Sequence, residues 1–175
     1  GGDSTVQEPA NVAENIGLDF IAITDHDDKM NGIPKHWPEI TRAKTKTTLI
    51  YGMEWTHGVN WFTCKGHMNL WSARPFDYRK IWAANEAGDP DMAQKEAKEQ
   101  GVLFSINHPN VFGFSWNYDF PSDLPSMEIW NGMFETTSSR KTITQNWNGY
   151  FARGIKVTGV GGSDVHDIHG KKASY

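Results

Sequence analysis

Acidic residues and histidines gather at the points where short apolar segments begin or end. Imidazole nitrogens and carboxylate oxygens, in a chain with one cysteine, are the donor set of Zn²⁺, Mn²⁺ or Fe ions rather than of a thiolate site. The carboxyl ends of parallel strands open onto one face of an α/β fold, so residues distant in sequence converge there. Asp164 and His166 are two residues apart, which in an extended segment places both side chains on one face. The residues of this set are Asp25, His26, Asp27, Glu54, His67, His108, Asp164 and His166.

Most of these residues also have an ordinary structural interpretation. A histidine before a proline, such as His108, is typical of a hydrogen-bonded loop, and Asp25 or Asp27 is typical of a turn or a helix N-cap. Glu54 is harder to explain in this way, because a carboxylate inside the apolar segment 48–55 is costly to bury without a cation or a pairing group. Taken together, the residues favour a metal site.

Other side chains show no spacing that indicates a site. Cys64 lies beside Trp61 and Phe62, which is typical of a packed thiol rather than a nucleophile. The remaining histidines lie in polar stretches and are expected to have no chemical role: His36, His57 and His169. Three tryptophans either line an aromatic pocket or pack in the core: Trp55, Trp61 and Trp130.

Length and composition restrict the class of protein. The chain has 175 residues, a formal net charge of −4 and eight tryptophans, which predicts one globular domain over residues 1–175. The absence of a basic run argues against a nucleic-acid binder, and no apolar run reaches the ~18 residues of a membrane span. The single cysteine indicates neither the cytoplasm nor the periplasm.

Short apolar segments alternate with helical patterns, as expected for a mostly parallel sheet with crossover helices. Strands are predicted at 19–24, 48–55, 66–72, 102–106, 127–130 and 155–160. Helices are predicted at 9–16, 76–84, 91–100 and 136–153, and residues 33–44 are predicted to form a loop followed by a helix. Six strands in 175 residues fall short of a complete barrel of about 250 residues.

Five motifs occur in a characteristic order: GLDFIAITDHDD, GMEW, GHMN, INHP and GGSDVH. Between Gly17 and His166 this order resembles the PHP (polymerase and histidinol phosphatase) superfamily of metal-dependent hydrolases. The resemblance implies an α/β fold, the distorted (β/α)7 TIM-like barrel of that superfamily. The tryptophan-rich stretches around Glu54 and residues 130–132 are similar to its carbaryl-hydrolase-like branch.

The resemblance also implies a cluster of two or three divalent transition metals, Zn, Mn or Fe. Glu54 is implied to bridge two of the ions. Asp25, beside the ligand His26, is expected to orient that histidine or to accept a proton from the attacking water. The implied ligands are His26, Glu54, His67, His108, Asp164 and His166.

The chain departs from the superfamily in one motif. Superfamily members carry a His-x-His pair on their first strand, and this sequence has none. Asp3 matches the acidic residue that follows that pair in other members, and the chain begins at Gly1 without a methionine. We therefore expect this sequence to be a piece that lacks the first strand, and the piece alone to be poorly stable and nearly inactive.

The predicted function is metal-dependent hydrolysis of a small-molecule ester, with phosphoesters as the favoured class. Carboxylic or carbamate esters hydrolysed by the same cluster are the alternative among enzymes. A noncatalytic PHP-like binding domain is the alternative outside enzymes. No nucleic-acid or membrane partner is expected, and the sequence predicts neither the oligomeric state nor the compartment.

Overall fold

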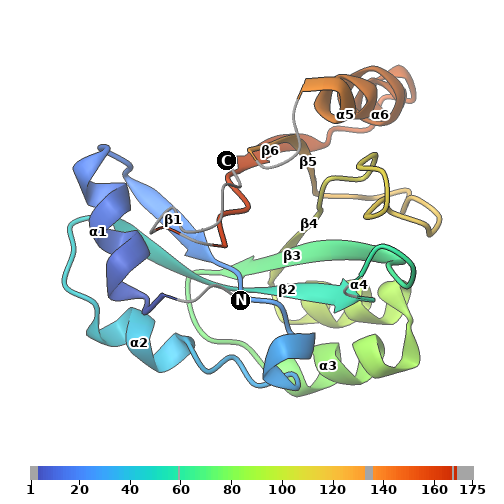
Figure 1. Ribbon diagram of the computed structural model, residues 1–175. Helices are drawn as coiled ribbons and strands as arrows, with labels where there is room; N and C mark the ends of the chain where they lie inside the picture. The colour runs from blue at the N-terminus through green and yellow to red at the C-terminus, as the bar shows by residue number, and fades with distance from the viewer. Residues whose placement is uncertain (1–3, 59, 133–135, 167, 169–175) are drawn as a thin grey trace.

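A single curled sheet of six strands forms the centre of the molecule (Figure 1). The structure is a computed structural model that describes residues 4–58, 60–132, 136–166 and 168. The strands follow one another across the sheet in sequence order. They are β1 (Phe20–Ile23), β2 (Thr48–His57), β3 (Gly66–Ser72), β4 (Leu103–Ile106), β5 (Ser126–Asn131) and β6 (Thr158–Gly162).

The direction of β3 differs from the predicted mostly parallel sheet. β1 pairs with β2, β4 with β5 and β5 with β6 in parallel, but β3 is antiparallel to both β2 and β4. Only residues 58–65 connect β2 to β3, which is too short for the crossover of a dozen or more residues that a parallel pair requires. The prediction of a mostly parallel sheet is therefore wrong at its centre.

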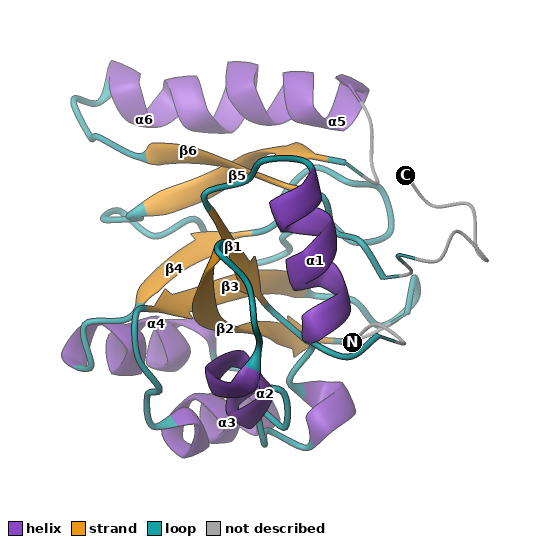
Figure 2. Ribbon diagram, turned by 90° about the vertical axis from the view of Figure 1, so that its left-hand side faces the viewer, coloured by secondary structure: helices purple, strands orange, loops and turns teal. Residues whose placement is uncertain are grey.

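The sheet is open among the described residues, with β1 and β6 as its edges. Its curvature gives half of a barrel, with the helices on the outer side (Figure 2). The (β/α)7 ring itself is not seen in the part of the chain that the structure describes. No helix in these ranges is long and apolar enough to cross a membrane.

The helices lie close to their predicted positions. Those near the sheet's first half are α1 (Gln7–Asn15), α2 (Trp37–Arg42), α3 (Tyr78–Ala87) and α4 (Pro90–Glu99). Asp77 and Asp89 cap α3 and α4 by accepting hydrogen bonds from backbone N–H groups of the first turn. A short 3₁₀ turn, Asp28–Met30, follows β1.

The predicted helix 136–153 is interrupted. It consists of α5 (Thr136–Lys141), a π-helical stretch (Thr142–Trp147) and α6 (Asn148–Ala152). The strand predicted at 155–160 begins three residues later, at Thr158. The Ile155 N–H still closes the helix end by bonding to the Tyr150 carbonyl, and the Val157 carbonyl accepts a bond from the Trp147 indole, so these residues are occupied before the sheet begins.

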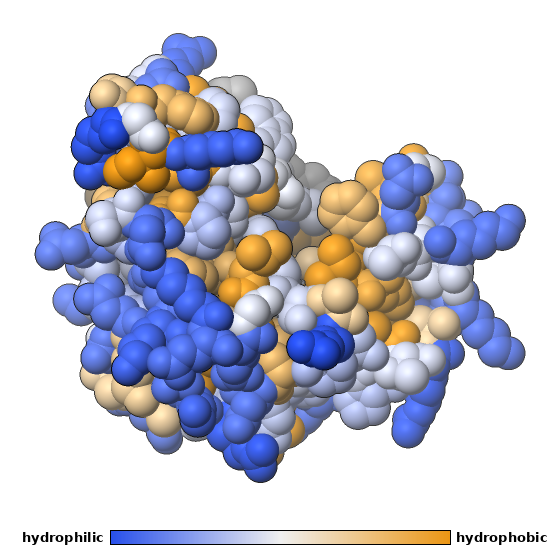
Figure 3. Space-filling model, turned by 180° about the vertical axis from the view of Figure 1, so that it is seen from behind, coloured by the Kyte–Doolittle hydropathy of each residue, from blue (hydrophilic) through white to orange (hydrophobic). Residues whose placement is uncertain are grey.

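The main hydrophobic core lies between the sheet and α3 and α4. Phe104 and Ile106 of β4 are buried there, together with Leu70 of β3. The alternating residue Leu103 points to the other face and is 60% exposed. Phe20, at the start of β1, is 64% exposed. Apolar side chains also gather around a hollow on the rear face of the molecule (Figure 3).

The two faces of β4 give a matched test of this core. Phe104→Ala leaves a cavity beside α4, and we expect it to lower the free energy of unfolding by about 3–5 kcal/mol. Leu103→Ala on the exposed face should cost less than about 1 kcal/mol. Urea unfolding followed by circular dichroism measures both variants, and equal losses would contradict this assignment of the faces.

Candidate metal centre

Three predicted ligands come together where β1, β2 and β3 meet. After β1 the chain stays beside β2: the Glu54 N–H donates to the Asp25 carbonyl at 3.0 Å, and the Asp27 N–H donates to the Glu54 carbonyl at 2.9 Å. In the antiparallel pair His67 faces Thr56 of β2. One ligand atom each from His26, Glu54 and His67 lies within 4.8 Å of the others.

The Glu54 carboxylate lies at the centre of this group. Its Oε2 is 3.1 Å from His26 Nδ1, and its Oε1 is 3.2 Å from His67 Nδ1. Asn107 donates its side-chain amide to Oε1 at 2.9 Å. The two oxygens of one carboxylate therefore face two different imidazoles, as in a bridging ligand.

His108 approaches the same carboxylate from the end of β4. Its Nε2 is 3.9 Å from Glu54 Oε1, and its ring centroid is 5.1 Å from that of His67. The other nitrogen, Nδ1, lies 3.2 Å from the Phe114 carbonyl, and a proton there places the lone pair of the ring on Nε2, on the side of Glu54. The backbone of His108 has φ of 28°, which non-glycine residues rarely adopt.

His166 reaches the centre from the segment after β6, which also carries Asp164. His166 Nε2 is 3.3 Å from His26 Nε2, and His166 Nδ1 lies 2.8 Å from the Asp164 carbonyl. The extended conformation expected for this segment is wrong, because Asp164 has φ of 52°. The turn at Asp164 directs its carboxylate toward Asn131, whose amide donates to Oδ2 at 3.2 Å.

The electrostatics fit a site that accepts cations. Burial and the neighbouring His67 lower the pKa of His108 to about 4, so this ring is neutral at pH 7, and burial also lowers the pKa of His26. Burial opposes ionisation of Glu54, but its contacts with His26 and His67 outweigh burial and lower the pKa of this carboxyl. Burial opposes protonation of His67, but its contacts with Cys64 and Glu54 raise the pKa of this imidazole. Burial and the Glu54 charge raise the pKa of Asp164 to about 6.

The residues of this centre fit a divalent transition metal. His67 Nδ1 is buried and lies 3.2 Å from Glu54 Oε1 without the geometry of a hydrogen bond, although a buried polar atom ordinarily makes one. Its other nitrogen, Nε2, lies 3.3 Å from the Gly58 carbonyl, so with the proton on Nε2 the Nδ1 lone pair and Glu54 would face a shared cation. Two imidazole nitrogens and a carboxylate within one small space are ligands of Zn²⁺, Mn²⁺ or Fe²⁺.

Glu128 of β5 is a buried acid that was not among the predicted site residues. Its Oε2 accepts hydrogen bonds from the His108 N–H at 2.7 Å and from the Asn131 amide at 3.1 Å. Burial raises the pKa of Glu128 to about 8. A Cβ on Gly162 would lie 2.7 Å from Glu128 Oε1, so the glycine makes room for this carboxyl. The missed signal is the one used for Glu54, an acid inside an apolar strand.

Asp25 and Asp27 have different surroundings. The Asp25 carboxylate lies 3.2 Å from Nδ1 of His36, a histidine expected to have no role. Asp27 is fully buried and accepts hydrogen bonds from the Thr56 N–H at 2.9 Å and from the Asn85 amide at 2.8–2.9 Å. Asp27 therefore ties the segment after β1 to β2 and α3.

The structure also shows the surroundings of Cys64 and of the three tryptophans named above. Cys64 is buried, as predicted for a packed thiol, with its sulfur 3.6 Å from His67 Nε2. Trp55 is fully buried in the core, whereas Trp61 and Trp130 are about half exposed, at 50% and 52%. Asp3 and His169 lie outside the described residues.

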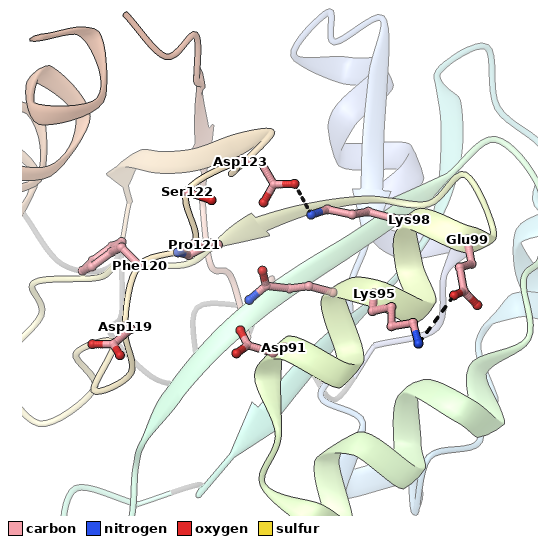
Figure 4. Close-up of a pocket in the computed structure, with 10 residues that line it drawn as sticks. Asp91, Lys95, Lys98, Glu99, Asp119, Phe120, Pro121, Ser122 and Asp123 are labelled. Atoms are coloured by element: carbon pink, nitrogen blue, oxygen red, sulfur yellow. Dashed lines mark hydrogen bonds and ion pairs between the residues drawn. The ribbon is translucent and has the colours of Figure 1, made fainter. Parts of the chain in front are cut away.

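A groove of about 470 Å³ lies elsewhere, between α4 and residues 119–123 (Figure 4). Ion pairs join Lys98 to Asp123 at 2.5 Å and Lys95 to Glu99 at 3.9 Å. None of the candidate metal ligands lines this groove.

The chain is similar in sequence to two curated proteins and in fold to two solved structures. No family model matches the chain. It is 28% identical over 130 residues to a probable phosphatase of Aliivibrio fischeri strain ES114, and 28% identical over 132 residues to one of strain MJ11. Each alignment covers 69% of this chain and 50% of the relative, so the chain spans about half the length of these curated proteins.

Two solved structures share the fold. One is a two-domain protein of Bacteroides vulgatus containing a PHP-like metal-dependent phosphoesterase, with a TM-score of 0.58 and 19% identity over 94% of this chain and 48% of that one. The other is described as a metal-dependent phosphoesterase of Bifidobacterium adolescentis, with a TM-score of 0.63 and 15% identity over 95% of this chain and 84% of that one. The curled sheet is therefore a PHP-like fold.

Proposed function

We propose that this protein is a metal-dependent phosphoesterase that hydrolyses a small-molecule phosphoester. The observation that carries the proposal is the buried Glu54 carboxylate, whose two oxygens lie 3.1 and 3.2 Å from nitrogens of two histidines, His26 and His67. The named phosphatases and phosphoesterases among the similar proteins support the same reaction class.

The proposed site holds two or three divalent transition metals. Such ions, when bound, lower the pKa of a water molecule and stabilise charge on the phosphoryl oxygens. The proposed ligands are His26, Glu54, His67, His108, Asp164 and His166. Asn107 orients Glu54, and the Phe114 carbonyl and Glu128 hold His108 at its ring and at its backbone.

Asp25 is proposed to accept a proton from the attacking water or to orient His26. The Asp25 carboxylate lies 3.2 Å from Nδ1 of the buried His36, whose Nε2 lies 2.9 Å from the Gly52 carbonyl of β2. His36 therefore lies between Asp25 and β2. A carboxylate in this position can accept a proton from water.

The finer features of the superfamily are part of the same proposal. The distorted (β/α)7 barrel of the superfamily is the proposed architecture. The carbaryl-hydrolase-like branch stays a prediction, with carboxylic or carbamate esters as the alternative substrates. A panel of phosphate, carboxylate and carbamate esters separates these alternatives, and a noncatalytic domain would hydrolyse none of them.

Metal content and Glu54 test the centre directly. Full-length protein reconstituted with Zn²⁺, Mn²⁺ or Fe²⁺ should carry at least two equivalents by mass spectrometry. Glu54→Gln should lose metal and phosphoesterase activity together, because a neutral amide does not compensate two cations. The exposed Glu86→Gln is the matched control and should change neither. Normal metal content and turnover in Glu54→Gln would refute the bridging role.

Glu128 tests the support of His108. Glu128→Ala leaves the His108 N–H and the Asn131 amide without their acceptor, and we expect metal affinity to fall about 10–100-fold. Glu128→Gln keeps an acceptor oxygen and should retain most of that affinity. Competition with a chromogenic chelator measures both variants. Equal losses in the two variants would contradict a role for the acceptor oxygen.

A further inference from the structure

Four aromatic residues lie on the two loops that lead into His67 and away from His108. We call them the aromatic rim: Trp61, Phe62, Phe112 and Phe114. Phe62 is 95% exposed, Phe112 78% and Trp61 50%, and Phe114 is half-buried. Exposed aromatic side chains gathered in one place are a feature of binding sites.

The rim begins at the metal centre and extends outward. The Phe114 ring lies 6.2 Å from the ring of His67, and the Trp61 ring lies 5.9 Å from that of Phe114. Phe112 follows at 4.9 Å from Trp61. Trp61 meets both phenyl rings at 79–84°, so neither phenyl ring lies flat on the indole.

The geometry of the rim is fixed by the same contacts that support the metal centre. The Phe114 carbonyl lies 3.2 Å from His108 Nδ1. Trp61 packs so closely on Gly113 that a Cβ there would lie 2.4 Å from the indole, and Gly113 has φ of 84°. The two loops are thereby locked together, and a binding surface that is already ordered loses little conformational entropy when it binds.

We propose that the aromatic rim binds a planar aromatic group of the substrate while the phosphoryl group lies at the metal centre. This inference rests on the proposed phosphoesterase function and names the class of ester. An indole with exposed area, flanked by phenyl rings, is suited to stacking on a flat aromatic group.

A membrane surface is the less favoured occupant. Residues 58–65 and 109–117 contain one basic residue, Lys65, whereas attraction to anionic lipid requires a cluster of Lys and Arg. Asparagines are instead interspersed with the aromatic residues: Asn60, Asn110 and Asn117.

Binding of non-hydrolysable phosphonates tests the proposal without relying on turnover. Calorimetry on the metal-loaded full-length protein would compare 2-phenylethylphosphonate with 2-cyclohexylethylphosphonate, which is similar in size but not flat. We expect the aromatic compound to bind about tenfold more tightly. An adenine-bearing phosphonoethyl compound distinguishes a nucleobase from a simple aryl group, because only a nucleobase site would favour it over the phenyl compound.

Substitutions locate this preference on the rim. Trp61→Leu and Phe112→Leu should remove it. The affinity of each variant for methylphosphonate, which has no ring, is measured beside it to separate this loss from any change at the metal centre. Phe151→Leu is the matched control, since Phe151 is 46% exposed and packs on Trp147 at 4.9 Å and 78°, much as Phe112 packs on Trp61. This control should keep the full preference.

Different results would overturn the rim proposal and the proposed phosphoesterase function. Methylphosphonate binding without an aromatic preference, or a preference that survives both rim variants, overturns the rim proposal alone. Failure to bind any phosphonate, together with no phosphoester turnover, overturns the proposed function and the rim proposal with it. Sedimentation with vesicles of phosphatidylcholine and phosphatidylglycerol that is lost in Trp61→Leu would assign the rim to a membrane surface and overturn the proposal.

Discussion

A carboxylate buried inside the sheet is the constraint on which the rest of the site depends. Glu54 is 5% exposed, and an ionised carboxylate in such a place is destabilising by several kcal/mol unless cationic or donor groups surround it. His26, His67 and Asn107 approach it from three different segments. The need to compensate one charge thus holds together the ends of β1, β2, β3 and β4.

The reversed direction of β3 is what allows His67 to take part. In a sheet of parallel strands, a residue at the start of a strand lies at the end opposite the active site. Because β3 is antiparallel to β2 and β4, its first residues lie beside the last residues of its neighbours, and His67 pairs with Thr56. The short connection between β2 and β3 is therefore part of the site's construction, and the same loop carries Trp61.

The sequence predicts the positions of the strands better than their directions. All six strands occur near their predicted positions, because the apolar runs are bounded by polar residues and glycines. An apolar run has no direction, so the antiparallel β3 was not foreseen. The late start of β6 depends on the Trp147 indole bonding to the Val157 carbonyl, a tertiary contact that no local pattern shows.

The candidate ligands were predictable from residue type and motif, but their supports were not. Glu128 and Asn131 of β5 are hydrogen-bonded to two of the predicted ligands. Glu128 accepts from the N–H of His108, which follows β4, and Asn131 donates to Glu128 and to Asp164, which follows β6. The left-handed backbone at Asp164 likewise depends on neighbours distant in sequence. Such contacts are visible only when the strands are placed side by side.

Two of the candidate ligands have a strained backbone conformation. His108 and Asp164 have φ of 28° and 52°, and a non-glycine residue in such a conformation costs on the order of 1–3 kcal/mol. Both are restrained through one hydrogen-bonded unit, in which Glu128 holds the His108 N–H and Asn131 joins Glu128 to Asp164. Strained backbone of this kind clusters at functional sites. Here it occurs at two of the candidate ligands, and the hydrogen bonds of Glu128 and Asn131 hold it in place.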